Sequence, residues 1–111
     1  MAVEHVEVAK ALRFIWDHYR HPLLGVDDVV AATTLSKTGL NNAFQQYLKC
    51  AIGEEIRRIR LVRAKELLRS TRTSVAKIAA ACGYSDDKHL RTSLRRDTGL
   101  SPRAWRRTVQ A

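Results

Sequence analysis

The chain has 111 residues, of which 45% are hydrophobic and 28% charged, with only 5 Gly and 2 Pro. This size and composition are typical of one globular domain, or two very small ones, and exclude a disordered or low-complexity chain. No apolar run reaches the ~18–20 residues that span a bilayer, and the N-terminus lacks the pattern of a signal peptide, so we expect a cytoplasmic protein.

Positive charge is concentrated in the second half of the chain. The 20 Lys and Arg residues and 11 Asp and Glu residues give a formal net charge of +9. Residues 1–56 carry five basic and seven acidic side chains, a net charge of −2, whereas residues 57–111 carry fifteen and four, a net charge of +11. This asymmetry indicates a polyanionic partner, with nucleic acid favoured over an anionic membrane surface.

The first half of the chain has helical periodicity throughout. An opening helix is predicted by apolar residues that share one face: Val8, Leu12, Ile15, Trp16 and Tyr19. A short helix is predicted over 27–32 after the break at Pro22 and Gly25. Ser36 is a suitable N-cap for the next helix, which buries Leu40 and Phe44.

Residues 54–68 predict a long helix with a wide apolar arc, so we expect it to connect two bodies. Arg60 and Arg63 interrupt that arc, and we expect buried aliphatic stems with paired charged heads. Further helices are predicted over 75–81, capped by Ser74, over about 86–97, ended by Gly99, and after Ser101 and Pro102. The fold class is therefore all-α with about seven helices. We expect a first subdomain over 1–52, a connector helix over 53–70 and a second subdomain over 71–111.

Two segments repeat one pattern. VDDVVAATTLSKTGLNNAF, from Val26, and VAKIAAACGYSDDKHLRTSL, from Val75, each contain a short helix with small residues, a tight turn and a capped longer helix. That pattern is typical of a helix-turn-helix, in which the second helix is free to enter the DNA major groove.

Residues 26–107 resemble the DNA-binding domain of the AraC/XylS-type transcription regulators. The resemblance depends on RIRLVRAKELLRST, SVAKIAAACGYSD, RRDTGLSP and AWRR, which follow in the family's order and spacing. It implies two homeodomain-like helix-turn-helix subdomains that read successive major grooves of double-stranded DNA, ~34 Å apart, in a bacterial, nucleoid-associated regulator. It also implies RNA polymerase as a second partner. Lys49 stands where the family usually has Gly, so we expect that turn to be built differently, with help from Gly53.

The opening ALRFIWDHYRHPLLGVDDVV, together with EEIRRIRLVRA, is similar to the xylose-operon-regulator branch of that family. In this branch a sugar-sensing domain precedes the DNA-binding domain. We therefore expect a ligand-responsive regulator in which any small-molecule effector binds a domain absent from this chain. A stand-alone small activator is the alternative.

The resemblance implies base contacts from the first recognition helix at Thr38, Asn41 and Asn42, and the exposed face adds Lys37 and Gln45. Asn can bond bidentately to adenine, and the Thr methyl can meet the thymine methyl. The alternative is a solvated polar face.

In the second recognition helix the positions that match the family's contacts are Asp87, Lys88, His89 and Thr92, with Arg91 beside them. Lys88 and Arg91 suit guanine or phosphate, whereas Asp87 could accept from cytosine or cap the helix. The resemblance is also consistent with a helix that contacts the DNA backbone more than the bases.

The candidates for phosphate contacts are hydroxyl and basic residues: Ser36, Arg57, Arg58, Arg69, Arg72, Ser85, Arg95, Arg96, Arg103 and Arg106. A basic face that only keeps the protein soluble is the alternative. We expect both tryptophans, Trp16 and Trp105, in the core rather than stacked on bases.

No pattern indicates catalysis or a cofactor. His18 and His21 lack a third ligand, Cys50 and Cys82 suggest reduced thiols, and no catalytic triad or phosphate loop is present. Two other classes of function remain open, a basic module that docks on RNA polymerase and a non-specific binder of RNA or membrane. Only 6% of residues are aromatic, and the apolar stripes are needed for the core, which argues against RNA stacking and membrane insertion.

Overall fold

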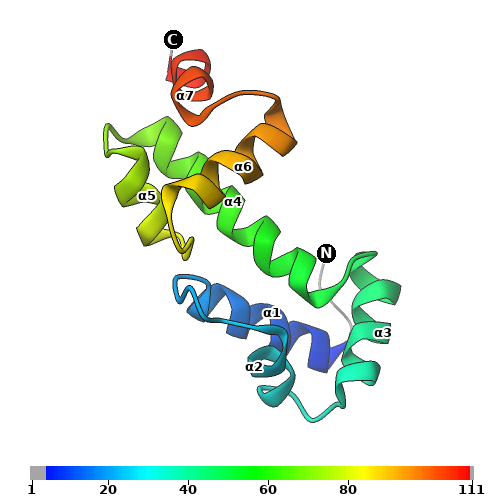
Figure 1. Cartoon of the computed structure of the whole chain (residues 1–111). Helices are drawn as coiled ribbons and strands as arrows, with labels where there is room; N and C mark the ends of the chain where they lie inside the picture. Colours follow the sequence, from blue (N-terminus) through cyan, green and yellow to red (C-terminus); the bar gives the residue numbers. More distant parts are fainter. Residues whose placement is uncertain (1–4, 111) are drawn as a thin grey trace. The chain divides into compact units, whose positions relative to one another are not determined.

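The computed structural model describes residues 5–110, and its regular elements there are all helices (Figure 1). The prediction of an all-α chain is confirmed. Residues 1–4 and 111, at the outer ends of the predicted subdomains 1–52 and 71–111, lie outside the described residues. The helices are α1 (Val6–His18), α2 (Val26–Ala31), α3 (Lys37–Leu48), α4 (Ile52–Ser70), α5 (Val75–Ala81), α6 (Asp87–Thr98) and α7 (Pro102–Gln110).

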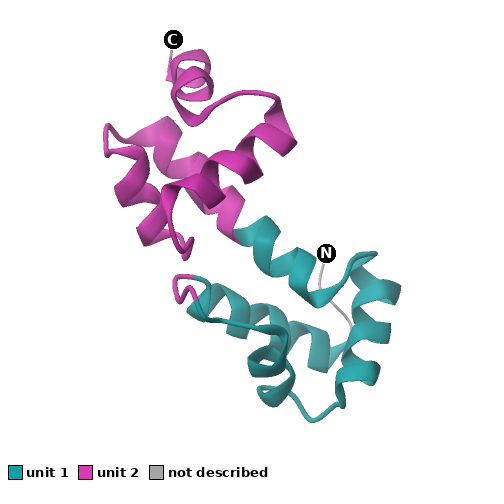
Figure 2. Cartoon of the chain, viewed as in Figure 1, with its two compact units in different colours: residues 1–19, 23–59 teal, residues 20–22, 60–111 magenta. Residues whose placement is uncertain are grey.

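The chain divides into two compact units (Figure 2). Unit 1 comprises residues 1–19 and 23–59, and unit 2 comprises residues 20–22 and 60–111, so α4 contributes to both. Counted by unit, the charge is nearly as uneven as by sequence halves. Unit 1 has six basic and seven acidic residues, a net charge of −1, whereas unit 2 has fourteen and four, a net charge of +10.

In unit 1, α1, α2 and α3 pack on one another, and the start of α4 completes the core. The largest fully buried side chains there are Val8, Ile15, Val29, Leu40, Phe44, Ile52 and Ile59. Because Leu40 and Phe44 hold one side of α3 in this core, the opposite side of α3 faces solvent.

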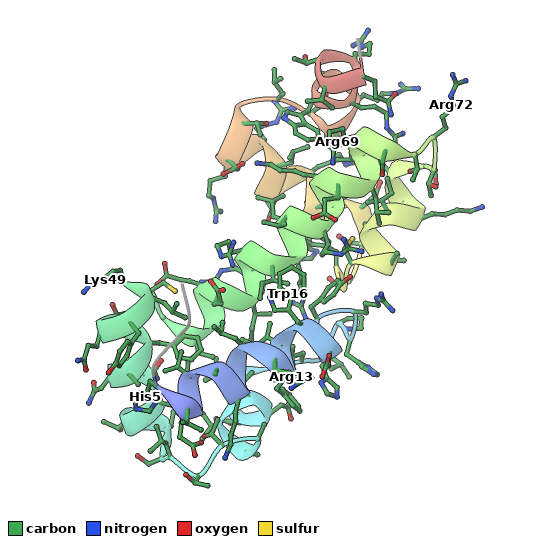
Figure 3. All side chains as sticks on the ribbon, turned by 180° about the vertical axis from the view of Figure 1, so that it is seen from behind. His5, Arg13, Trp16, Lys49, Arg69 and Arg72 are labelled. Atoms are coloured by element: carbon green, nitrogen blue, oxygen red, sulfur yellow. The ribbon has the colours of Figure 1, made fainter. Side chains whose placement is uncertain are left out.

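Trp16 is not in the core, and the prediction for it is wrong. Its side chain is 43% exposed on α1 and makes an edge contact with the Tyr19 ring, with centroids 6.0 Å apart (Figure 3). One residue turns a helix by about 100°, which places Trp16 at the margin of the stripe that contains Ile15. Trp105 in contrast packs against the core of unit 2, as expected, with Lys65 Nζ 5.8 Å from its ring centroid.

Unit 2 has its own core, in which α5 packs on α6 and α6 on α7. Its buried residues are Ala64, Leu68, Ile78, Ala79, Cys82, Leu90 and Leu94. The small side chain of Ala79 permits the close approach that the helix-turn-helix pattern predicts. No helix within residues 5–110 is both long and apolar enough to cross a membrane.

The predicted serine caps are confirmed. The Oγ atoms of Ser36 and Ser74 accept hydrogen bonds from backbone N–H groups three residues later, at 3.1 and 3.2 Å, and Ser101 does the same at 3.2 Å. Each satisfies one of the N–H groups that a helix start leaves without a partner. Gly99 ends α6 in the left-handed conformation, with φ 78°.

The turn after α3 corrects a prediction. Lys49 itself adopts the left-handed conformation, with φ 59° and ψ 30°, so the backbone has the conformation that a glycine would favour. Gly53 lies inside α4 and does not build the turn. The Lys49 ammonium donates to the Gln46 carbonyl at 3.0 Å, a local contact that accompanies this conformation.

Candidate nucleic-acid interface

The exposed side of α3 brings the predicted base-contacting residues of unit 1 together. Thr38, Asn42 and Gln45 are exposed, and Asn41 is half-buried. These four positions repeat at the spacing of one helix face, opposite the buried Leu40. Lys37, at the start of the helix, is exposed and lies 3.4 Å from the Asp27 carboxylate. The face formed by Thr38, Asn41, Asn42 and Gln45 is therefore polar, carries no charged side chain, and can donate and accept hydrogen bonds.

The exposed side of α6 is strongly basic. A shallow groove of about 350 Å³ runs along it, lined by Lys88, Arg91, Thr92, Arg95 and Arg96. The sequence predicted these five residues for bases or phosphate, and the structure places them on one surface. The groove suits an anion that runs along the helix.

The start of α6 distinguishes two neighbouring aspartates. Asp86, not Asp87, is the N-cap, and its Oδ1 accepts from the His89 N–H at 3.0 Å. Asp87 is half-buried and pairs with Arg91 at 2.7 Å, which corrects the interpretation of Asp87 as a cap. The His89 backbone N–H, followed by its ring, holds the pKa of the Asp86 carboxyl below its ordinary value.

The predicted phosphate contacts fall into two groups. Six arginines are exposed and have no hydrogen-bond or ion-pair partner in the described part of the chain: Arg57, Arg69, Arg72, Arg95, Arg96 and Arg103. Arg72 extends away from the loop that follows α4 (Figure 3). Ser85 is also exposed, whereas the exposed hydroxyl of Ser36 serves as the α3 cap.

Arg58 and Arg106 form the second group, because their guanidinium groups are engaged within the protein. Arg58 donates to both oxygens of the buried Glu55, each at 2.8 Å. Arg106 is half-buried and donates to the carbonyls of Leu68, at 3.1 Å, and Thr73, at 2.6 Å. Arg60 and Arg63 behave as expected, with half-buried side chains whose heads contact the His21 carbonyl and Glu66 respectively.

A second groove, of about 430 Å³, lies among α5, α6 and α7, and the sequence did not reveal it. Its lining residues come from three separate segments: Ser74, Val75, Asp87, Arg91, Pro102, Arg103 and Arg106. No local signal could have found the groove, because only tertiary packing brings these segments together.

Neither cysteine takes part in this surface. Both thiols are free, and burial raises the pKa of Cys82 to about 11. Desolvation also raises the pKa of Cys50, with added effects from Glu55 and Glu54. Within residues 5–110 no group of three or more His, Cys, Asp or Glu side chains could hold a metal ion.

Comparison with known proteins decides the family. A family model described as a helix-turn-helix domain matches residues 29–108. RhaS from Escherichia fergusonii, an HTH-type transcriptional activator, is 39% identical over 72 residues, which cover 65% of this chain and 26% of that protein. The chain belongs to the AraC-type helix-turn-helix family.

Solved structures agree with this assignment. The C-terminal domain of the response regulator AraT from Geobacillus stearothermophilus has a TM-score of 0.90 and 27% identity, over 96% of this AraC-type chain and 88% of that domain. The DNA-binding domain of AdpA, in complex with a target DNA, has a TM-score of 0.85 and 24% identity, over 92% and 91%, and thus shares the fold. The chain spans about a quarter to a third of the length of the curated relatives it matches.

Proposed function

We propose that this AraC-type domain binds double-stranded DNA sequence-specifically in transcription regulation. In this proposal α3 reads base edges, and unit 2 supplies most of the phosphate contacts. The observation that carries the proposal is the contrast between the uncharged polar face of α3, in a unit of net charge −1, and the basic surface of unit 2, with net charge +10.

The two surfaces suit different parts of recognition. Phosphate attraction is electrostatic and independent of sequence, so an uncharged face gains little from it. Amide and hydroxyl groups instead match the donor and acceptor pattern of base edges in the major groove. Thr38, Asn41, Asn42 and Gln45 carry such groups on the exposed side of a helix held by a buried core. The basic groove of α6 adds phosphate contacts and further base contacts.

Selection from a random duplex pool at physiological salt tests the proposal. A consensus with two short boxes about one helical turn apart supports two recognition helices in successive major grooves. Diffuse binding that depends steeply on salt and enriches no sequence would contradict the proposal and favour the basic interaction module.

Two variants then separate base reading from phosphate binding. Asn42→Ala should cost about 1–3 kcal/mol on the selected site and relax one base position, because one side chain can pair with one base. Arg96→Ala should weaken selected and random duplexes alike and lower the salt slope by about one. Equal losses for Asn42→Ala on both duplexes would contradict a base-reading role for Asn42.

We also infer that the protein is a transcription activator that contacts RNA polymerase at the nucleoid. We further infer that it responds to a small molecule, which is a sugar in the xylose-operon-regulator branch that the opening residues resemble. The transcriptional activator RhaS, with 39% identity, supports the activator part. Transcription in vitro with purified RNA polymerase on the selected site tests it. More transcript with the protein than without it supports activation, and less transcript indicates a repressor.

A further inference from the structure

The imidazole of His89 is held at one of its two nitrogens. Asp86 Oδ1 lies 2.7 Å from His89 Nδ1, and Ser85 Oγ lies 3.1 Å from the same nitrogen. The same Asp86 oxygen accepts from the His89 backbone N–H at 3.0 Å. The carboxylate that caps α6 therefore also orients the ring.

These contacts determine which nitrogen carries the hydrogen. An ionised carboxylate can only accept hydrogen bonds, so Nδ1 must donate. In the neutral ring Nε2 is then an acceptor, and in the protonated ring it becomes a donor, while the Nδ1 contact to Asp86 is the same in both. The His89 side chain is 64% exposed, and Nε2 has no hydrogen-bond partner within residues 5–110.

We propose that Asp86 makes His89 a proton-dependent base reader in the second recognition helix. The neutral ring accepts from the amino group of cytosine or adenine, and the protonated ring donates to O6 or N7 of guanine. This inference depends on the proposed DNA-binding function and specifies which bases the helix prefers. The charged group in contact with the ring is the Asp86 carboxylate, which the Lys88 charge also influences, whereas Asp87 is paired with Arg91.

The ring geometry can be tested without DNA. Nitrogen-15 NMR of the whole chain at about pH 8, above the range in which histidine usually titrates, reports the tautomer of each histidine. We expect the Nδ1–H tautomer for His89, with the exposed His21 as an internal reference. Asp86→Ser keeps a good N-cap but removes the carboxylate, so the tautomer preference should be lost while α6 stays folded. A predominant Nε2–H tautomer in the unaltered protein would overturn the proposal.

Base reading is tested by repeating the duplex selection at about pH 8 and about pH 5, on either side of histidine titration. One position should change from cytosine or adenine to guanine, with about a tenfold change in relative affinity. His89→Gln is the matched control, because glutamine carries a donor and an acceptor but does not titrate. Its preference should be the same at both pH values.

The possible failures can be told apart. If sequences are enriched but the preferred bases are the same at both pH values, the His89 proposal is wrong and the proposed function stands. The His89 proposal is also wrong, and the proposed function stands, if the only change at low pH is a steeper slope of log affinity against log salt. In that case the protonated ring contacts a phosphate. If no sequence is enriched at either pH, the proposed function fails, and base reading by His89 fails with it.

Discussion

Two arginines on α7, three residues apart, should lose different properties on replacement by alanine. Arg106 donates to the carbonyls of Leu68 and Thr73, which lie at and beyond the end of α4. Arg103 is exposed and has no such partner in the described part of the chain. We therefore expect Arg106→Ala to lower stability and Arg103→Ala to lower DNA affinity.

The magnitude for Arg106 follows from its two bonds. Hydrogen bonds from a charged donor contribute about 1.5–3 kcal/mol when buried, and much less when exposed to water. Taking about 1.5 kcal/mol for the half-buried bond to Leu68 and about 0.5 for the exposed bond to Thr73 gives a loss of about 2 kcal/mol. Arg103→Ala removes only an exposed side chain, so its effect on the free energy of unfolding should stay within about 0.5 kcal/mol.

Urea denaturation and salt-dependent DNA binding measure the two effects. Arg103→Ala should lower the slope of log affinity against log salt by about 0.9, the value for one lost phosphate contact, whereas Arg106→Ala should leave the slope unchanged once the protein is fully folded. If Arg106→Ala unfolded at the same urea concentration as the unaltered protein and bound with a shallower salt slope, the structural role would be refuted. Arg106 would then belong with the phosphate contacts.

Two further predictions concern stability. Lys49→Gly should raise the free energy of unfolding by about 0.5–1 kcal/mol, because the left-handed conformation is strained for lysine. Gly99→Ala, at φ 78°, should lower the free energy of unfolding by a similar amount, about 0.5–1 kcal/mol. Urea midpoints that move in the same direction for both variants would contradict this reasoning. Hydrogen bonds from Thr34 lower the pKa of Glu7 in the folded state. The stability that these bonds supply is therefore present above the ordinary pKa of glutamate, and it is lost as pH falls through the lowered pKa. Glu7→Gln should therefore flatten the acid side of the stability profile, with Asp17→Asn as the control, and an unchanged profile would rule out this contribution.

Local signals were enough to predict the helices and their serine caps. Ser36, Ser74 and Ser101 each accept from an N–H group three residues away, so the pattern that predicts each cap lies within one short segment. The same holds for the exposed polar face of α3, because helical periodicity alone separates Asn42 from Leu40. These are the parts of the fold and site that sequence could supply.

Contacts between distant segments could not be predicted in this way. Arg106 reaches Leu68 across 38 residues, and Glu7 binds Thr34 across 27. The sequence shows that Arg106 is positively charged but not where its guanidinium group lies. Trp16 illustrates a related limit, since a residue at the margin of an apolar stripe is buried only if another element covers it.

Charge counting alone therefore overstates the electrostatic part of recognition. Of the eight arginines assigned to phosphate from the sequence, Arg58 and Arg106 are engaged within the protein, and six remain exposed without partners in the described residues. An arginine that is engaged within the protein does not bind phosphate, and the affinity lost in this way is the same for all DNA sequences. The contacts proposed for the uncharged face of α3 do not depend on these arginines. If α3 reads bases as proposed, we therefore expect its base contacts to contribute a larger share of the binding free energy than the net charge of +9 alone suggests.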